Sequence, residues 1–451
     1  MYNTRVPVND TIVSYTNLIK PYGNQNALLA ATANVAAKVI SDPAKRASTL
    51  ADFKTGLDKW QQVQIHPQIL HSPTHRMAAL LQSHIVRQAT GAQKVESFLL
   101  KIADFILEGF EVRFSNADWV DWAASFFTWI AAIVPATQPP PDPAAAPIDD
   151  NLSMGILGDF GTGLYGAPIS CKSIDNSNDS YSLMLHLGDV YYSATPDEVQ
   201  DRFFKFWPSK AALNRTINGN HEMYTGGHTY FDTMLPKFGQ KASYFALQNA
   251  NWCLAVLDTA YHEDLGGQEG QLDDAQMTWL ANIVEAAGKR KLVLFSHHQP
   301  FTQLDSNLGG NLLSQMVKFN LADKIFAWYW GHEHRCLLYD PHPTYGFHGR
   351  CVGHGGFPQE RPVLGNAPGH PEFGSQWRQL QRKEGQNDAG QTVPIPGAWI
   401  YDNNNLYLPS GLQTQFAPHG FMRLEFQDDQ IVEYVRTPLN ANVWLQSLIA
   451  T

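Results

Sequence analysis

Five short motifs rich in acidic, amide and histidine side chains follow one another along the last two thirds of this 451-residue chain. They are Gly158-Asp159-Phe160-Gly161, Gly188-Asp189-Val190-Tyr191-Tyr192, Gly219-Asn220-His221-Glu222, Ser296-His297-His298-Gln299-Pro300 and Gly331-His332-Glu333-His334. Each motif comes at the end of a short apolar run, such as residues 154–157 before the first. Such runs predict buried strands, and open α/β sheets collect their site residues just past the carboxyl ends of strands. The motifs therefore constrain the chain to a fold that brings five strand ends together.

Helical patterns alternate with the predicted strands over residues 197–207 and 272–287, which indicates an α/β region. After the last motif, residues 365–397 are rich in Gly, Pro and Gln and are predicted to form a long loop. Residues 421–426 and 431–436 alternate around a polar turn and predict a closing hairpin.

The first third of the chain has a different sequence pattern. Residues 1–134 carry Ala-rich helical patterns, for example over residues 26–40 and 47–63, and predict an all-α domain of unknown role. The uninterrupted apolar run at its end, residues 122–134, is shorter than the roughly 20 residues that cross a bilayer. It is interpreted as a packed helix, with an interfacial or partner-binding helix as the alternative. Residues 135–148 are rich in Pro and Ala and predict an extended, semi-rigid linker, which leaves residues 149–451 as the catalytic domain.

Charge is unevenly distributed between these parts. The whole chain has a net charge of −10, from 32 Lys and Arg against 42 Asp and Glu. Residues 1–148 hold 12 basic and 11 acidic residues, so residues 149–451 hold 20 basic and 31 acidic ones. Because nucleic-acid binding depends on neutralising phosphates, we expect no binding to a nucleic-acid backbone. Contact with a membrane or a protein through the helical amino-terminal part is left open.

The amino-terminal sequence lacks a basic segment followed by an apolar core, so no signal peptide is predicted and a cytoplasmic location is expected. Export by another route is not excluded by this observation. The four cysteines are too few and too scattered for a disulfide framework. We expect free buried thiols, with Cys336 and Cys351 as the one pair to examine for a bridge.

The motif residues suit a pair of metal ions. Two ions about 3.5–4 Å apart can stabilise both the attacking and the leaving oxygen of a phosphoryl transfer. A strand-end carboxylate such as that of Asp189 can supply one oxygen to each ion. A set that mixes carboxylate, amide and imidazole favours transition metals over magnesium or calcium.

In order and spacing, the five motifs resemble those of the calcineurin-like metallophosphoesterase superfamily and, within it, the purple acid phosphatases. Most of the superfamily has a histidine two residues after the first aspartate, whereas this chain has Asp159-Phe160-Gly161. The purple enzymes have instead a tyrosine three residues after the bridging aspartate, a position that Tyr192 occupies here. The resemblance covers residues 154–357 and implies a metallophosphoesterase-type β-sandwich flanked by helices.

The resemblance also implies a role for each motif residue. Asp189 would bridge two ions, with Asp159, Tyr192 and His334 on the first and Asn220, His298 and His332 on the second. His298 is preferred over His297 because the family ligand lies two residues before a proline, here Pro300. A phenolate ligand implies Fe(III) at the first site, with divalent iron, zinc or manganese at the second.

The implied reaction is attack of metal-bound hydroxide on a phosphomonoester, with His221 contacting phosphate or protonating the leaving group. Four further residues are weaker candidates. Glu222 is expected to orient His221, Asp258 to support the site from behind it, and His297 and His354 to line the substrate pocket. The sequence leaves two alternatives open: a phosphodiesterase of the same superfamily, and a partner- or membrane-binding effector whose metal domain is vestigial.

Overall fold

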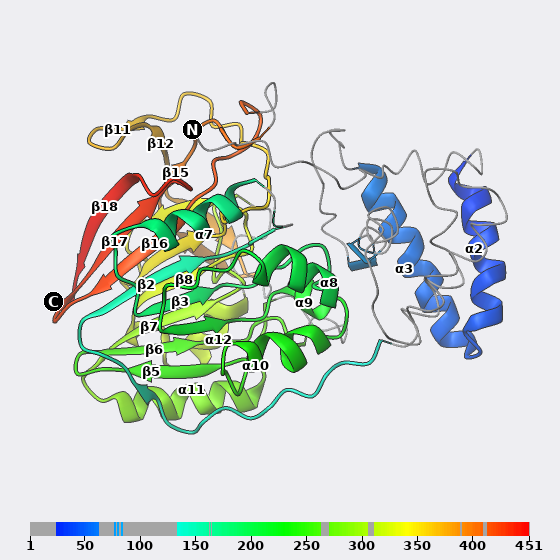
Figure 1. Ribbon diagram of the computed structural model, residues 1–451, viewed down its shortest axis with the longest axis horizontal. Coiled ribbons are helices and arrows are strands. Elements are labelled where there is room, and N and C mark those ends of the chain that lie inside the picture. The colour runs from blue at the N-terminus through cyan, green and yellow to red at the C-terminus, as the bar shows by residue number, and fades with distance from the viewer. Residues whose placement is uncertain are drawn as a thin grey trace.

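The structure is a computed structural model. It describes residues 24–62, 76–77, 79–80, 83, 133–161, 163, 165–262, 270–304, 311–387, 390–408 and 413–450. Within these residues, two β-sheets pack face to face and helices cover both outer faces (Figure 1). This is the helix-flanked sandwich that the sequence predicted, with the helices α2 (Gln25–Val39) and α3 (Pro43–Gln62) preceding it.

The larger sheet has ten strands, and its central strands β6, β7, β8 and β10 run parallel. In spatial order the strands are β1 (Ala146–Pro147), β5 (Phe245–Gln248), β6 (Trp252–Val256), β7 (Lys291–Ser296), β8 (Ile325–Trp330), β10 (His348–Val352), β9 (Cys336–Tyr339), β15 (Ala398–Tyr401), β12 (Gly374–Leu380) and β11 (Gly369–His370). A separate two-stranded sheet pairs β13 (Lys383–Gln386) with β14 (Thr392–Ile395).

The smaller sheet has six strands, of which β2, β3 and β4 run parallel. In spatial order it contains β18 (Asn442–Ile449), β17 (Gln430–Arg436), β16 (Phe421–Phe426), β2 (Leu152–Leu157), β3 (Leu183–His186) and β4 (Leu213–Thr216). The predicted closing hairpin is the β16–β17 pair, and β18 extends it to a third antiparallel strand.

Helices on each outer face bury the side chains that point away from the sandwich interior. On the smaller sheet these are α7 (Gly166–Asn176), α8 (Pro196–Glu198), η2 (Val199–Phe204), α9 (Asn220–Met223), η3 (Tyr230–Met234) and α10 (Leu235–Lys237). On the larger sheet they are α11 (Asp274–Ala287), α12 (Asn311–Lys318) and η5 (Ala322–Lys324).

A buried ion pair joins the two sheets across their largely apolar interface. Arg350 on β10 of the larger sheet lies 2.9 Å from Glu433 on β17 of the smaller one, and both are buried. The Tyr329 hydroxyl donates to the same carboxylate at 2.8 Å. Because removing one partner of a buried pair leaves an uncompensated charge, this contact specifies how the two sheets face each other.

The structure corrects one expectation about extended segments. Residues 365–397 do not form one long loop, because β11, β12, β13 and β14 lie in this range. The described part of the Pro- and Ala-rich linker packs along the two-sheet domain. The Gln138 side chain donates to Asp258 at 2.8 Å, Trp279 donates to the Asp142 carbonyl at 3.0 Å, and β1 pairs with β5. The domain boundary itself stays a prediction.

All four cysteines are free and buried. Cys336 and Cys351 lie on the paired strands β9 and β10, but Cys336 is opposite Val352 and Cys351 is opposite Leu337. Successive residues of a strand point to opposite faces, so the two thiols belong to different hydrophobic clusters.

In the amino-terminal part, α2 and α3 match the helices predicted over residues 26–40 and 47–63. Most of the apolar run 122–134 lies outside the described residues, and so does most of the segment expected to contact a membrane or a partner. Among the helices that the structure describes, none has the length and apolar character needed to cross a bilayer.

Candidate metal centre

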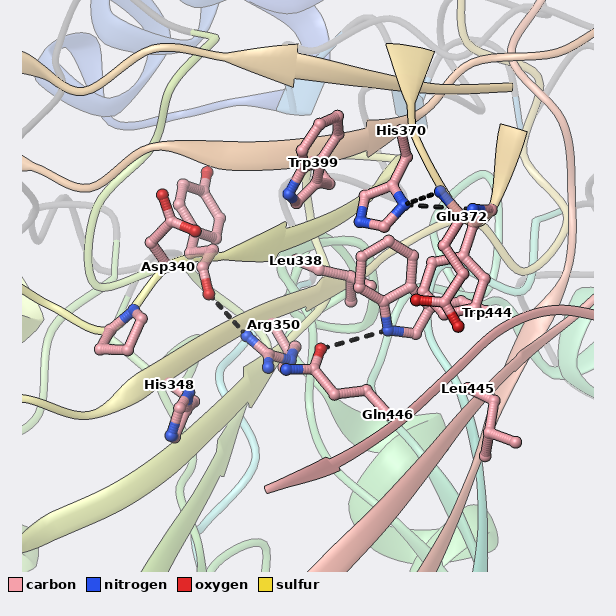
Figure 2. Close-up of a pocket in the computed structure, with 13 residues that line it drawn as sticks. Leu338, Asp340, His348, Arg350, His370, Glu372, Trp399, Trp444, Leu445 and Gln446 are labelled. Atoms are coloured by element: carbon pink, nitrogen blue, oxygen red, sulfur yellow. Dashed lines mark hydrogen bonds between the residues drawn. The ribbon is translucent and has the colours of Figure 1, made fainter. Parts of the chain in front are cut away.

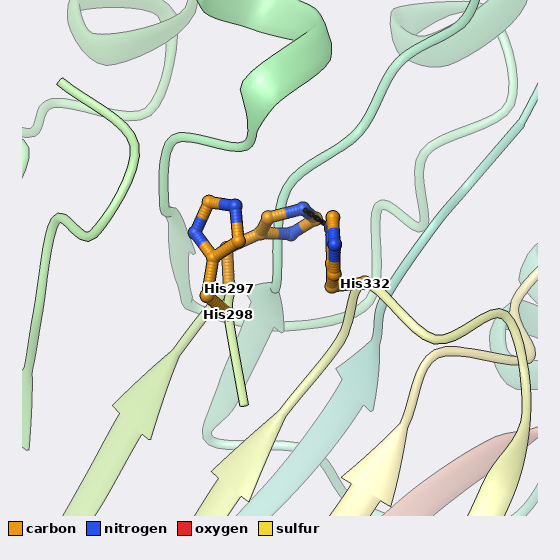
Figure 3. A group of neighbouring side chains, drawn as sticks. All are labelled: His297, His298 and His332. Atoms are coloured by element: carbon orange, nitrogen blue, oxygen red, sulfur yellow. Dashed lines mark hydrogen bonds between the residues drawn. The ribbon is translucent and has the colours of Figure 1, made fainter. Parts of the chain in front are cut away.

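Parallel strands from both sheets end at the same edge of the sandwich, and the motif residues turn sharply after them. Asp159, Asp189, His332 and His334 all have a backbone φ between 50° and 72°. Residues other than glycine rarely adopt this left-handed conformation, and it persists where the surrounding structure imposes it. The turns redirect each side chain across the strand ends, and Figure 3 shows three of the histidine rings gathered there.

Glycines make room for this close approach. A Cβ atom on Gly219 would lie 2.2 Å from Asp189 Oδ1, and one on Gly353 would lie 2.6 Å from Asp159 Oδ2. Side-chain carbon atoms do not approach oxygen so closely. The glycine beside each carboxylate is therefore a steric requirement of the site.

The first group of candidate ligands is Asp159, Asp189 and His334, whose ligand atoms lie within 4.8 Å of one another. Asp159 Oδ2 accepts the His332 backbone N–H at 2.8 Å. Asp159 Oδ1 is buried and has no hydrogen-bond partner among the described residues, although His334 Nε2 lies 3.4 Å away. Burial raises the pKa of Asp159 well above its usual range. An unsatisfied buried carboxylate oxygen fits a bound cation.

The second group is His297, His298 and His332. His297 Nδ1 lies 2.7 Å from the Leu187 carbonyl oxygen, so Nδ1 carries a proton. Asn220 Oδ1 and Asp189 Oδ1 lie 3.0 and 3.3 Å from this Nε2. The Asn220 amide donates to the Tyr224 hydroxyl at 2.7 Å, which orients its oxygen toward the histidines. Burial alone would lower the pKa of His297, but the neighbouring Asp189 raises it, so a proton on Nε2 can be donated to the Asn220 and Asp189 oxygens. A bound cation would take the place of this proton.

Both histidines of the fourth motif lie in this group, and the preference for His298 as the ligand stays a prediction. The contacts to Asn220 and Asp189 belong to His297. The His298 ring lies 4.5 Å from that of His332, and its Nδ1 lies 2.9 Å from the Thr259 hydroxyl. The proline spacing identified a position along the chain, whereas the direction of each ring depends on the turn after β7.

Asp189 lies between the two groups. Its Oδ1 is 3.3 Å from His297 Nε2, while its Oδ2 accepts the Tyr191 hydroxyl at 2.9 Å. Burial alone would raise the pKa of Asp189, but the nearby His297 and His221 lower it well below its usual range. The side chain is therefore a buried anion with one oxygen toward each group.

The structure places Tyr191, not the predicted Tyr192, at the first group. The Tyr191 hydroxyl contacts Asp189 and His334, and its ring stacks on Phe357 with centroids 4.3 Å apart. The Tyr192 ring lies instead near the Arg202 guanidinium, 5.6 Å from its central carbon. Glu198 accepts the backbone N–H groups of Tyr192, Ser193 and Thr195, which holds this stretch in a turn away from the strand ends.

His221 lies beside Asp189. Its backbone N–H donates to Asp189 Oδ1 at 3.2 Å, and its Nε2 lies 3.9 Å from Asp189 Oδ2. Its Nδ1 lies 2.5 Å from the Tyr192 carbonyl oxygen, so the carbonyl orients the ring. This corrects the expectation that Glu222 holds the imidazole.

Glu222 supports the loops instead. Its carboxylate accepts the backbone N–H groups of Asp189, Val190 and Gly219 at 2.8–2.9 Å. Burial and the neighbouring Asp189 raise the pKa of Glu222 to about 8, an effect that the three N–H groups oppose. Glu222 thus joins the second motif to the third through the main chain.

Asp258 and His354 lie behind the site. Asp258 accepts hydrogen bonds from Gln138, Tyr261 N and Ala260 N at 2.8–3.2 Å, and its supporting role at the site stays a prediction. His354 packs against Gly420, and burial together with His419 lowers its pKa to about 3. Among the described residues, no hydrogen bond joins the His354 ring to either candidate group.

Sequence reasoning missed Tyr191 and Glu198. The pair Tyr191-Tyr192 offered two phenols, and no pattern in the sequence indicates which of them faces the site. Glu198 had a detectable signal, because Thr195 and Glu198 form a capping box at the start of α8.

Comparison with known proteins identifies the class to which this domain belongs. Residues 156–336 match the family model described as calcineurin-like phosphoesterase, so this part of the chain is a phosphoesterase domain of that family. The family uses a dinuclear metal centre, and the two candidate groups lie in the same domain, with His334 and His332 near its end. No curated protein sequence matches the chain significantly.

Solved structures similar to this chain include a purple acid phosphatase, an anchor protein of the inner membrane complex and a dimetal phosphatase. Purple acid phosphatase PPD1 from yellow lupin (Lupinus luteus) is 12% identical, with a TM-score of 0.44 over 66% of this chain; only 53% of the lupin chain is covered. GAP50 of Plasmodium, the anchor in the inner membrane complex, is 12% identical, with a TM-score of 0.44 over 67% of this chain and 89% of its own. A dimetal phosphatase from Danio rerio is 11% identical, with a TM-score of 0.40 over 66% of this chain and 99% of its own. Similarity at this level carries no argument about substrate.

The role of Glu222 can be tested with a matched pair of variants. In Glu222→Gln the amide nitrogen must face at least one backbone N–H, so we expect stability to fall by about 1–3 kcal/mol and bound metal to decrease. Glu198→Gln disturbs an equivalent set of three backbone N–H groups farther along the same loop. We expect it to lower stability similarly but to lose less metal. Equal metal contents in the two variants, measured by elemental analysis alongside thermal unfolding, would contradict the role assigned to Glu222.

Proposed function

We propose that this chain is a binuclear metal-dependent phosphatase that hydrolyses phosphomonoesters and resembles the purple acid phosphatases. The observation that carries the proposal is the position of Asp189, which directs one carboxylate oxygen to each of two groups of candidate ligands. A single buried anion shared between two such groups favours a pair of ions over a single ion.

The ligand assignment follows these contacts. We assign Asp159, His334 and a tyrosine to one ion, Asn220, His332 and His297 or His298 to the other, and Asp189 to both. The unsatisfied Asp159 Oδ1 and the Asn220 and Asp189 oxygens near His297 Nε2 support this assignment. Bound ions would supply Lewis acidity and an activated water molecule. Carboxylate, amide, imidazole and phenol together favour Fe(III) beside the tyrosine and divalent iron, zinc or manganese at the second position.

Within this site His221 is assigned to contact the phosphate or to donate a proton to the leaving oxygen. Its Nδ1 is engaged by the Tyr192 carbonyl, so its Nε2 faces the side of Asp189 where the two groups meet. An imidazole held in one orientation at the reacting centre suits general acid catalysis. The cytoplasmic location expected from the amino-terminal sequence stays a prediction.

Replacing the shared carboxylate tests the proposal most directly. Asp189→Asn removes the charge that both ions would share, so we expect loss of both metals and of p-nitrophenyl phosphate hydrolysis. Asp258→Asn changes another buried aspartate near the strand ends and serves as the control, because we expect it to retain both ions. Two bound ions with near-normal turnover in Asp189→Asn would refute the bridging role. Faster hydrolysis of bis(p-nitrophenyl) phosphate by the native protein would identify a phosphodiesterase instead.

The two tyrosines provide a spectroscopic test. A phenolate bound to Fe(III) gives the protein a visible charge-transfer band. Since the Tyr191 hydroxyl contacts Asp189 and His334, we expect Tyr191→Phe to abolish this band and Tyr192→Phe to preserve it. Loss of the band in Tyr192→Phe alone would restore the assignment made from motif spacing. A colourless, iron-free native protein that still hydrolyses phosphomonoesters would exclude the iron assignment but not the phosphatase.

The proposed role of His221 predicts a different outcome. In His221→Ala we expect both metals to remain bound and turnover to fall roughly 10²–10⁴-fold, the usual contribution of a general acid. Metal analysis and turnover on the same preparation check this expectation. If metal is lost together with activity, His221 belongs among the ligands.

A further inference from the structure

Residues 134–138, the linker stretch, bring the chain from the amino-terminal part onto the sandwich, and they lie between two loops of the metal centre. The first, the Asn220 turn, comprises residues 224–228 directly after α9. The second, the Thr259 loop, comprises residues 258–261 after β6. Each loop holds a residue considered for the second ion, Asn220 in one case and His298 in the other.

The linker stretch contacts the Asn220 turn through its backbone. The Asn220 amide donates to the Tyr224 hydroxyl at 2.7 Å, so the turn orients this candidate ligand. The Ala136 N–H donates to the Gly226 carbonyl, two residues further along, at 2.8 Å. A Cβ atom on Gly226, where φ is 80°, would lie 2.7 Å from the Val134 carbonyl oxygen. The two backbones therefore touch at a position that only glycine allows.

The linker stretch is also bonded to the Thr259 loop. The Thr259 hydroxyl accepts the His298 backbone N–H at 3.1 Å and lies 2.9 Å from Nδ1 of the same residue. The Tyr261 hydroxyl donates to the Ala136 carbonyl at 3.0 Å and accepts the Gln138 N–H at 3.3 Å. Ala136 is buried and thus bonds one loop through its N–H and the other through its carbonyl.

These bonds are shorter than the direct hydrogen bond between the two parts of the site. Asn218 Nδ2, two residues before the candidate ligand Asn220, donates to Asp258 Oδ1 at 3.4 Å, beyond the usual range for such a bond. Two side chains bind one ion only if their loops keep a fixed separation, and residues that hold metal ligands commonly change metal affinity 10–100-fold. The linker stretch is placed to fix that separation.

We propose that the linker stretch positions the ligands of the second ion, so that binding of this ion depends on how the linker is seated. The inference rests on the proposed binuclear site, in which Asn220 is assigned to the second ion. The amino-terminal part reaches the same turn, since Arg76 Nε donates to the Tyr224 carbonyl at 3.3 Å. Among the described residues, no hydrogen bond joins the linker stretch to Asp159 or His334, so the first ion is independent of it.

Tyr261→Phe tests the proposal by removing only the hydroxyl that holds Ala136 and Gln138. Equilibrium dialysis of the full-length protein against buffers of graded free Zn²⁺, followed by elemental analysis, measures how tightly each ion is held. We expect one binding step to weaken about two- to tenfold, as for loss of one hydrogen bond, and the other to stay unchanged. Tyr224→Phe should weaken the same step by roughly 10–100-fold, because it removes the partner of the Asn220 amide.

Two control variants separate positioning from a general loss of stability. Trp279→Phe removes another linker contact, the indole N–H that donates to the Asp142 carbonyl at 3.0 Å. Trp444→Phe removes the hydrogen bond from Trp444 Nε1 to Gln446 Oε1, 3.2 Å long, in the aromatic cleft of Figure 2. None of the residues that line this cleft belongs to the linker stretch or to either candidate group. We expect both controls to hold both ions as tightly as the native protein.

Ala136→Pro provides a second test if Tyr261→Phe does not fold, because it removes the N–H that Gly226 accepts and leaves the Thr259 loop intact. Asp258→Asn should not disturb the linker, since the Gln138 amide can turn its oxygen toward the new amide. A native protein with two ions, whose binding steps are unmoved or weakened equally in Tyr261→Phe and Ala136→Pro, would refute the role of the linker alone. A native protein that holds fewer than two ions would refute the binuclear site and this inference with it.

Discussion

Two buried carboxylates, Asp159 and Asp189, lie at the ends of the neighbouring parallel strands β2 and β3, and their mutual repulsion determines what this edge of the sandwich must contain. Two anions held together away from water require compensating positive charge. The histidines from the fourth and fifth motifs supply part of it when protonated, and bound cations would supply it more fully. The unsatisfied Asp159 Oδ1 and the oxygen atoms around His297 Nε2 are the observations that support a cation site at this edge.

Keeping these groups together has a steric and conformational cost for the surrounding structure. Left-handed backbone at four motif residues, and glycines beside both carboxylates, would be unfavourable in an ordinary loop. Buried acceptors compensate through the main chain. Glu222 and Glu198 each accept three backbone N–H groups, and Glu333 turns away between His332 and His334 to accept from Trp330. Because Glu333 points away, His332 joins one candidate group and His334 the other.

The sequence by itself determined the strand–motif order, the strands that carry the five motifs, and the family to which the domain belongs, because apolar runs and ligand spacing are local properties. It also identified the residues that the structure brings together, including Asp159, Asp189, Asn220, His332 and His334. It did not determine which of two adjacent side chains faces the site, Tyr191 or Tyr192 and His297 or His298, or what Glu222 contacts. A spacing pattern does not distinguish two adjacent residues, because the direction of each side chain depends on hydrogen bonds to distant acceptors such as Glu198 and the Leu187 carbonyl. Only the tertiary structure, which brings distant parts of the chain to the strand ends, shows that the Tyr191 hydroxyl contacts Asp189, that Glu222 accepts backbone N–H groups, and that both histidines lie in one group.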